Sequence, residues 1–385
     1  MSYAFGGPTV HRFRVLLSAV FALLSIFAIA LPIYASTPHH VFYLASGSSI
    51  TTYNVDPTTG DPTLVGTPLT ISGAQFTGIV PSPNDRVIYV FWPDTKNNVW
   101  LSVYDTDISG VPRKTPVQTL AARGWQLMIH PSGKYAYILK TVSGQQGYSS
   151  TLYLYNVDPT TGVLTQDPTI QATYGPDYFY LESLLSFNKA GTRLYDLWSV
   201  SFDGENNYYY SYHPVDTTTG QVSPDVGTIF TASNYTGLDE QYITSSLILN
   251  LDNQNSGSSV LKLFPNVKNP QHPYFVCDQT MLNACGTAYN YWVSVDGQYV
   301  LLPDTNDIVI GHIDITNKKI TETGIIPGNP FLYLAPDNEL IYAVNGSTNV
   351  VQVYLFDAAN GTVTAGGSTT FRSTNGYGLF PAVRR

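Results

Sequence analysis

Three charged side chains are the candidates for catalysis in this sequence: those of Arg123, Glu182 and Asp239. An arginine can bind a carboxylate or polarise a carbonyl group. A carboxylate that is partly removed from water has a raised pKa, which suits it to general acid or base catalysis. The combination predicts a hydrolytic site in which Arg123 polarises a carbonyl and Glu182 or Asp239 activates water. The alternative for Glu182 is a structural ion pair, because an unpaired charge on a central strand is costly.

Aromatic and acidic side chains form a second group of candidates, which we expect to contact a ligand where loops converge on a central channel. They are Trp92, Trp125, Tyr180, Glu240, Tyr289, Tyr291 and Tyr377. The chain contains 29 tyrosines and only 12% charged residues, a composition that favours stacking against sugar rings. The competing interpretation is that most tyrosines pack between sheets, since tyrosine is a favoured strand residue.

The common motifs of nucleophilic catalysis, metal binding and cofactor binding are absent from the sequence. No G-x-S-x-G, H-E-x-x-H, C-x-x-C, phosphate-loop or dinucleotide-binding pattern occurs, and no two of the seven histidines have ligand spacing. His40 lies a few residues after a predicted leader peptide and is interpreted as structural. We therefore predict no metal ion and no cofactor.

A repeated phrase indicates which elements position the candidate residues. Residues 53–60 read Tyr-Asn-Val-Asp-Pro-Thr-Thr-Gly, residues 155–162 are identical, and weaker copies occur at 214–220 and 355–361. The anchors of this phrase recur 43 to 58 residues apart, at Asp56, Asp105, Asp158, Asp216, Asn266, Asp314 and Asp357. A period of about 40–50 residues built from short strands is typical of a β-propeller. The anchors predict an all-β, seven-bladed β-propeller with four-stranded blades.

The turns and the chain ends complete this prediction. Each aspartate before Pro-Thr-Thr-Gly is expected to cap its turn by accepting backbone N–H bonds. Residues 40–46 match the apolar second strand of a blade but have no first strand before them. We expect them to complete the last blade, which begins at residues 377–381, because this pairing closes the ring and hides the sheet edges. Residues 36–385 are then a single domain.

These motifs resemble a known family. The turn Pro-Ser-Gly-Lys at 131–134, the apolar strand after it and the phrase at 155–162 are similar to the seven-bladed lactonase-like propellers. That family includes 6-phosphogluconolactonase-like and carboxymuconate cyclase-like proteins, and the surface-repeat propellers are similar to it. The resemblance spans residues 40–385 and implies the fold. Members believed to be active carry Pro-Arg-His before this turn, where Gly124, Trp125 and Gln126 stand here, so the resemblance does not carry over the catalytic residues.

Residues 1–35 are predicted to be a signal peptide. His11, Arg12 and Arg14 precede an uncharged apolar run at 15–31, and Ala35 offers a small residue for cleavage before Ser36. A retained membrane anchor is the alternative. Cleavage would leave the protein secreted, periplasmic or on the cell surface, and free of the membrane.

The cysteines and the charge are consistent with export. Cys277 and Cys285 are the only cysteines, and in an oxidising compartment they are expected to form a disulfide. The formal net charge is −9, and residues 1–35 contain two arginines and no acid, so the mature chain is more negative still. Such a surface repels nucleic acid.

Two functions follow from the sequence. The first is an exported, monomeric binding or scaffold module that holds a small molecule, a glycan or a partner protein at the channel mouth. The second is a divergent hydrolase of sugar or other lactones that uses Arg123, Glu182 and Asp239. Missing catalytic motifs favour the binding module.

Overall fold

The computed structural model contains two units, residues 1–37 and 38–385, and all residues it describes belong to the second. It describes residues 39–384 except 75–77, 84–85, 97, 123, 125, 145–146, 175–178, 189, 203–204, 224–226, 234–240, 244–246, 254–258, 266–274, 278–291, 295–296, 304–306, 315, 317–318, 329 and 373–376. The remaining residues of 143–149, 170–186, 196–211 and 224–290, together with 303, 319 and 377, have a described backbone but no described side chain. In the described part, no helix is long and apolar enough to span a membrane.

The described strands form four-stranded antiparallel sheets. The sheet that contains the N-terminal strand has the order β28 (Tyr377–Arg384), β1 (His39–Ser46), β2 (Ser49–Val55) and β3 (Pro62–Thr70). Three sheets follow along the chain: β4 (Gly78–Pro81), β5 (Val87–Pro93), β6 (Val99–Asp105) and β7 (Gln118–Ala121); β8 (Gln126–Ile129), β9 (Tyr135–Gly144), β10 (Gly147–Val157) and β11 (Leu164–Tyr174); β12 (Phe179–Phe187), β13 (Arg193–Phe202), β14 (Glu205–Pro214) and β15 (Gly227–Ser233).

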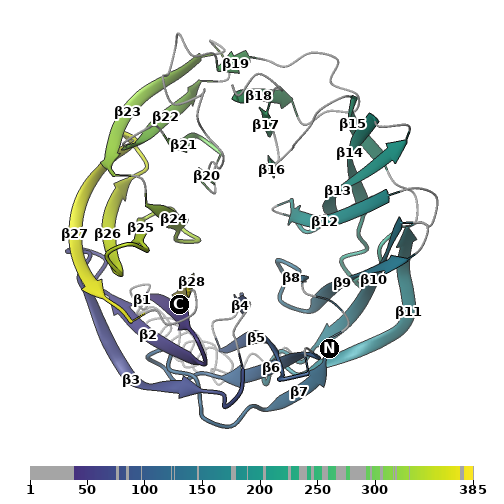
Figure 1. Ribbon diagram of the computed structural model, residues 1–385, viewed down its shortest axis with the longest axis horizontal. Helices are drawn as coiled ribbons and strands as arrows, with labels where there is room; N and C mark the ends of the chain where they lie inside the picture. The colour runs from purple at the N-terminus through teal and green to yellow at the C-terminus, as the bar shows by residue number, and fades with distance from the viewer. Residues whose placement is uncertain are drawn as a thin grey trace, which may run out of the picture. The chain divides into compact units, whose positions relative to one another are not determined.

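The remaining sheets have the same order of strands. They are β16 (Gln241–Ile243), β17 (Leu247–Asn253), β18 (Ser259–Pro265) and β19 (Phe275–Cys277); β20 (Trp292–Val293), β21 (Tyr299–Pro303), β22 (Asp307–Asp314) and β23 (Lys319–Pro327); β24 (Phe331–Leu334), β25 (Leu340–Asn345), β26 (Val350–Asp357) and β27 (Thr362–Thr370). Figure 1 shows the sheets following one another around a common axis, each with its first strand innermost. The arrangement is propeller-like, as the repeats predict.

The N-terminal strand closes this arrangement. β1 pairs with β28 along its whole length, from His39 opposite Arg384 to Ser46 opposite Tyr377, and with β2 on its other side. The two ends of the described chain therefore share one sheet, which hides the edges that each strand would otherwise expose. The predicted pairing of residues 40–46 with 377–381 is confirmed.

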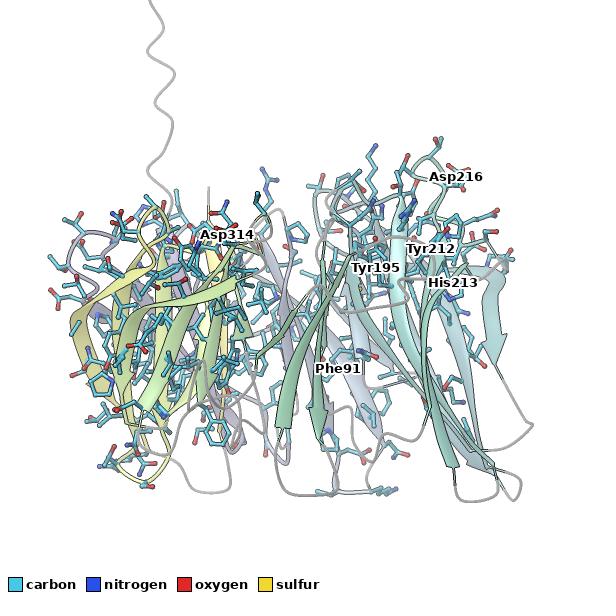
Figure 2. All side chains as sticks on the ribbon, turned by 90° about the horizontal axis from the view of Figure 1, so that it is seen from above. Phe91, Tyr195, Tyr212, His213, Asp216 and Asp314 are labelled. Atoms are coloured by element: carbon cyan, nitrogen blue, oxygen red, sulfur yellow. The ribbon has the colours of Figure 1, made fainter. Side chains whose placement is uncertain are left out.

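The strand order gives the ring of sheets two different faces, one at each end of the strands. Turns that join the first strand to the second, and the third to the fourth, lie on one face, which we call the Asp-turn face. Figure 2 shows Asp216 and Asp314, at the ends of third strands, at this face, whereas Phe91 on β5 lies toward the opposite one. The opposite face carries the second-to-third loops, where the sequence predicts the ligand site.

Aspartates cap the turns that give the Asp-turn face its name. Asp158 Oδ1 accepts the backbone N–H groups of Thr161 at 2.7 Å and Thr160 at 2.9 Å. Asp56 and Asp216 accept matching bonds in their own turns. The bonds from Thr161 and Thr160 hold the pKa of Asp158 below its usual value, because they stabilise the carboxylate. The predicted capping role is confirmed.

Buried tyrosines connect neighbouring sheets. Tyr89 on β5 is fully buried, and its hydroxyl donates a hydrogen bond of 3.0 Å to the carbonyl of Gly162 in the next sheet. Tyr43 on β1 bonds Gly110 in the same way, also at 3.0 Å. Gly162 has a φ of +69°, and a Cβ there would lie 2.5 Å from a methyl group of Val87. Glycine therefore ends the Thr-Thr-Gly phrase because the neighbouring sheet packs directly on it.

Candidate functional site

Most of the predicted site residues lie outside the described part of the chain. Among them are Arg123, Trp125, Asp239, Glu240, Tyr289, Tyr291 and Cys285. Only the backbone is described for Tyr180, Glu182, Cys277 and Tyr377. The backbone places Tyr180 and Glu182 on β12, an innermost strand, as predicted for Glu182. The catalytic and ligand roles of these residues, and the disulfide, stay predictions.

Trp92 is the one predicted ligand residue with a described side chain. It lies near the end of β5, is half-buried, and donates its indole N–H to Ser102 Oγ at 3.0 Å. Its ring stacks on that of Trp100, with centroids 6.2 Å apart and planes 26° apart. Asp94 completes the hairpin by accepting the Trp100 N–H at 3.2 Å and the side-chain amide of Asn98 at 2.9 Å. These bonds use Trp92 and its neighbours to hold the hairpin together.

Asp94 is strongly anionic within this hairpin. The side-chain bond from Asn98, with backbone and indole N–H bonds beside it, lowers the pKa of Asp94 to about 2. A carboxylate with so low a pKa is a poor general base near neutral pH. The hairpin at the face opposite the Asp turns can therefore contact a ligand but offers no base from Asp94.

A cavity of about 420 Å³ opens at the Asp-turn face. Its walls come from the ends of innermost strands and the turns after them: Pro81, Ser82, Pro83, Pro336, Asp337, Pro381, Ala382 and Val383. Proline rings offer apolar surface and no backbone N–H, so these walls present few donors. Asp337 is the only charged residue in this lining. The cavity combines an apolar wall with one carboxylate.

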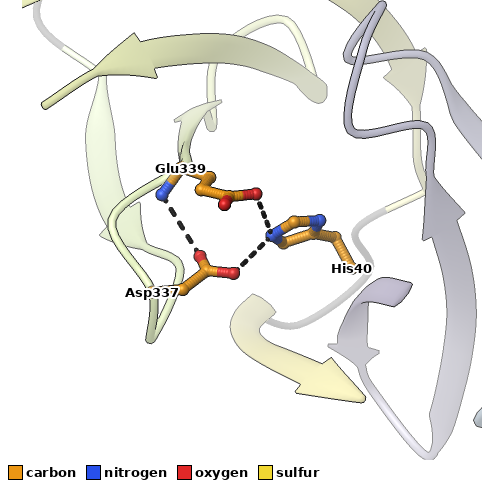
Figure 3. A group of neighbouring side chains, drawn as sticks. All are labelled: His40, Asp337 and Glu339. Carbon is orange, nitrogen blue, oxygen red and sulfur yellow. Dashed lines mark hydrogen bonds and ion pairs between the residues drawn. The ribbon is translucent and has the colours of Figure 1, made fainter. Parts of the chain in front are cut away.

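Asp337 belongs to a cluster with His40 and Glu339 (Figure 3). His40 Nε2 lies 2.8 Å from an Asp337 carboxylate oxygen and 3.6 Å from a Glu339 carboxylate oxygen. The His40 side chain is fully buried, whereas that of Asp337 is 18% exposed and that of Glu339 59%. The cluster therefore reaches from the interior to the surface.

Two sheets contribute to this cluster. His40 lies on β1, opposite Val383 of β28, and Val383 also lines the cavity. Asp337 and Glu339 lie in the turn between β24 and β25, where Asp337 accepts the backbone N–H of Glu339 at 3.2 Å. This turn is closed by the bond from the Ala335 N–H to the Leu340 carbonyl. The cluster thus joins the N-terminal strand to the neighbouring sheet.

Electrostatics keep the Asp337 carboxylate charged. Burial acts to raise its pKa, but the hydrogen bond from His40 and the N–H of Glu339 outweigh burial, so the pKa is lowered overall. His40 Nδ1 is buried and has no hydrogen-bond partner in the described structure. When the ring proton lies on Nε2, Nε2 donates to Asp337 and the buried Nδ1 keeps a bare lone pair.

No motif in the sequence indicates this cluster. The sequence predicts a structural role for His40 and does not single out Asp337, which is 297 positions away. Their meeting follows from ring closure, which places the strand at 40–46 beside the last repeat. The predicted closure, combined with the turn at 336–339, was the signal that could have found them.

No family model and no curated protein matches this sequence. Solved structures do match its fold. A candidate 6-phosphogluconolactonase from Bacteroides fragilis superposes with a TM-score of 0.62 at 15% identity, over 91% of this chain and 100% of that one. The periplasmic gluconolactonase PpgL of Pseudomonas aeruginosa has a TM-score of 0.60 at 13% identity, over 89% of this chain and 99% of its own.

A second candidate 6-phosphogluconolactonase, from Bacteroides uniformis, gives a TM-score of 0.57 at 13% identity over 89% of this chain and 99% of that one. The chain has the fold of the lactonase-like β-propellers. The predicted resemblance is confirmed at the level of structure. At such low identity, the lactonase-like fold by itself does not determine the activity.

Proposed function

We propose that the chain is an exported, monomeric, seven-bladed lactonase-like propeller that binds a small molecule or glycan in the cavity at its Asp-turn face. The observation that carries this proposal is the proline-walled cavity of about 420 Å³ with the Asp337 carboxylate at its edge. Small-molecule sites commonly measure about 300–1,000 Å³ and combine apolar walls with a few polar groups. Support for export comes from the leader-like residues 1–35.

The lining defines the chemical class of the ligand. Proline rings suit the apolar face of a sugar or another saturated ring, and Asp337 accepts hydrogen bonds from hydroxyl or ammonium groups. An anionic ligand such as a phosphorylated sugar would meet the charged Asp337 with no basic residue in the lining to offset it. We therefore expect a neutral or cationic ligand with hydrogen-bond donors.

Lactone hydrolysis is the alternative function, and the lactonase-like fold supports it only by analogy. A general base works best when its pKa lies near the working pH. The pKa of Asp337 is lowered rather than raised, which suits a hydrogen-bond acceptor better than a base. Binding is accordingly the function that the cavity supports best.

The test is calorimetric titration of the purified protein with neutral oligosaccharides and amino sugars, and with sugar phosphates as the anionic comparison. The variants are Asp337→Asn and, as a matched control, Glu322→Gln, which removes an exposed carboxylate on an outermost strand. A hydrogen bond to a charged group contributes about 1.5–3 kcal/mol, so Asp337→Asn should weaken binding roughly 10- to 150-fold. Glu322→Gln should leave the affinity unchanged.

Two results would overturn the binding proposal. One is the absence of binding by every neutral or cationic probe. The other is equal affinity in Asp337→Asn and the parent protein. A parallel panel of sugar and aliphatic lactones tests the alternative: turnover that disappears in an Arg123→Ala/Glu182→Ala variant would establish a hydrolase.

A further inference from the structure

Three potential metal ligands converge at the junction between β1 and the β24–β25 turn. One nitrogen of His40 and one oxygen each from Asp337 and Glu339 all lie within 4.8 Å of one another. Imidazole nitrogen and carboxylate oxygen are the donors, besides thiolate, that zinc takes in proteins. Figure 3 shows both carboxylates directed at the same ring nitrogen of His40.

The spacing of these atoms fits a tetrahedral ion. With bonds of about 2.1 Å, two ligands of a tetrahedral zinc lie about 3.4 Å apart. The separations from His40 Nε2 are 2.8 Å to Asp337 and 3.6 Å to Glu339, which lie on either side of that value. Small side-chain rotations would therefore be enough to place an ion between them.

The negative charge of the cluster also favours the binding of a cation. Two carboxylates face one imidazole, so the cluster carries a charge of about −2 when His40 is neutral and about −1 when it is protonated. His40 is fully buried, where uncompensated charge is costly. A divalent ion on a neutral His40 would balance both carboxylates.

We propose that His40, Asp337 and Glu339 bind a zinc ion that links the N-terminal strand to the neighbouring sheet. The ring proton of His40 then resides on Nδ1, and the fourth ligand position is open to water. Because Nδ1 has no acceptor in the described structure, we expect weaker binding than at sites whose histidines have such a partner. The ion would hold the strand that closes the ring.

The zinc site and the ligand cavity share Asp337 but differ at Glu339. Glu339 is a zinc ligand in this proposal but is not part of the cavity lining. A Glu339→Gln variant can therefore lose zinc and keep the cavity, which makes the two proposals separately testable.

The experiment is a titration of the metal-free mature protein with zinc chloride against a chromophoric chelator, followed by thermal unfolding with and without zinc. We expect one zinc per chain and a higher melting temperature in zinc, since a ligand that binds only the folded state stabilises it. Magnesium should have no such effect, because it prefers an octahedral shell of oxygens. Cobalt should give the intense visible absorption of a four-coordinate site.

Four variants locate the site. Glu339→Gln and His40→Gln should each weaken zinc binding at least tenfold, since even partners that only support a ligand are worth about 10- to 100-fold. A glutamine at position 40 can still donate to Asp337, which preserves the bond between the sheets. His39→Ala and Glu322→Gln alter exposed side chains and should bind zinc like the parent.

The outcomes are decisive even if one variant fails to fold. Glu339 is more than half exposed, so Glu339→Gln is expected to fold whatever happens to the His40 variant. Selective loss of zinc binding and of the cobalt spectrum in Glu339→Gln would support the site. No zinc binding by the parent, or binding that is equal in Glu339→Gln, would overturn the proposal.

Discussion

A pair of tyrosine substitutions tests how the sheets are joined. Tyr89 and Tyr342 occupy second strands of their sheets, and both are fully buried. The Tyr89 hydroxyl donates to the Gly162 carbonyl at 3.0 Å, whereas the Tyr342 hydroxyl has no hydrogen-bond partner in the described structure. Changing each to phenylalanine removes the same single oxygen. The two variants should nevertheless change stability in opposite directions.

The magnitudes follow from these environments. Tyr89→Phe removes a buried hydrogen bond and leaves the Gly162 carbonyl without that donor, which should lower the free energy of unfolding by about 1–2 kcal/mol. Tyr342→Phe removes a buried hydroxyl whose burial without a partner costs about 1–3 kcal/mol. That change should therefore raise the free energy of unfolding by about 1 kcal/mol or more. The two variants should differ by about 2–5 kcal/mol.

Urea unfolding followed by circular dichroism measures both effects. The slope of the free energy with urea should stay that of the parent, because neither change alters the surface exposed on unfolding, and the midpoint should move. A Tyr342→Phe variant that is as destabilised as Tyr89→Phe would refute the reasoning, since it would mean that the Tyr342 hydroxyl is paired. Tyr43→Phe, which loses a bond to Gly110, should behave like Tyr89→Phe.

Three further predictions concern the pH dependence and the closing strand. Asp158→Ala should lower the free energy of unfolding at neutral pH and lower it much less near pH 3. The N–H bonds of the turn lower the pKa of Asp158. Its carboxylate therefore stabilises the fold above the ordinary aspartate pKa, and this stabilisation is lost as the pH falls through the lowered pKa. Urea midpoints at the two pH values measure this, and an equal loss at both would contradict it. Burial raises the pKa of Tyr89 and of Tyr342, so the folded state disfavours their ionisation. The pH-dependent part of the free energy of unfolding that these two tyrosines supply is therefore complete below about pH 10 and is lost as the pH rises beyond it. Alkaline unfolding should therefore coincide with tyrosinate absorption, and gradual ionisation of a still-folded protein would count against these tyrosines. Deleting residues 36–46 removes β1 from between β28 and β2 and should abolish cooperative unfolding, whereas deleting 36–38 should not; calorimetry distinguishes the two.

Local signals made the sheets predictable from sequence. The aspartate of the repeated phrase caps a turn within three residues of itself, and the glycine that ends the phrase adopts a positive φ, so both act over short distances. The match between residues 40–46 and other second strands was enough to predict the pairing of β1 with β28. These features repeat along the chain, which allows one copy to be read from another.

The candidate site could not be predicted in the same way, because its residues come from different repeats that are far apart in the sequence. His40 and Asp337 are 297 positions apart, and no local pattern in the sequence connects the two residues. The cavity is walled by prolines whose sequence context indicates turns and strand ends. Which turns face a cavity depends on how the innermost strands meet, and this is a property of the assembled sheets.

The junction between the last sheet and the closing sheet keeps the buried tyrosine of the second strand, Tyr342, but not the hydrogen bond that this tyrosine makes in other sheets. At three other junctions the hydroxyl of such a tyrosine donates to the carbonyl of a glycine in the next sheet, as Tyr43, Tyr89 and Tyr137 do with Gly110, Gly162 and Gly220. At this junction the corresponding carbonyl, that of Gly60, accepts the N–H of Gly367 at 3.2 Å, and the Tyr342 hydroxyl has no hydrogen-bond partner in the described structure.

The same junction contains the bond between His40 and Asp337 and borders the cavity. A buried tyrosine that is kept without its hydrogen bond costs stability, and such local costs are expected at functional sites. If Tyr342→Phe raises stability and weakens zinc or ligand binding, the Tyr342 hydroxyl serves the binding of zinc or of the ligand. If it raises stability with no effect on either, the junction is a consequence of closing the ring with the N-terminal strand, and the functional surface lies elsewhere.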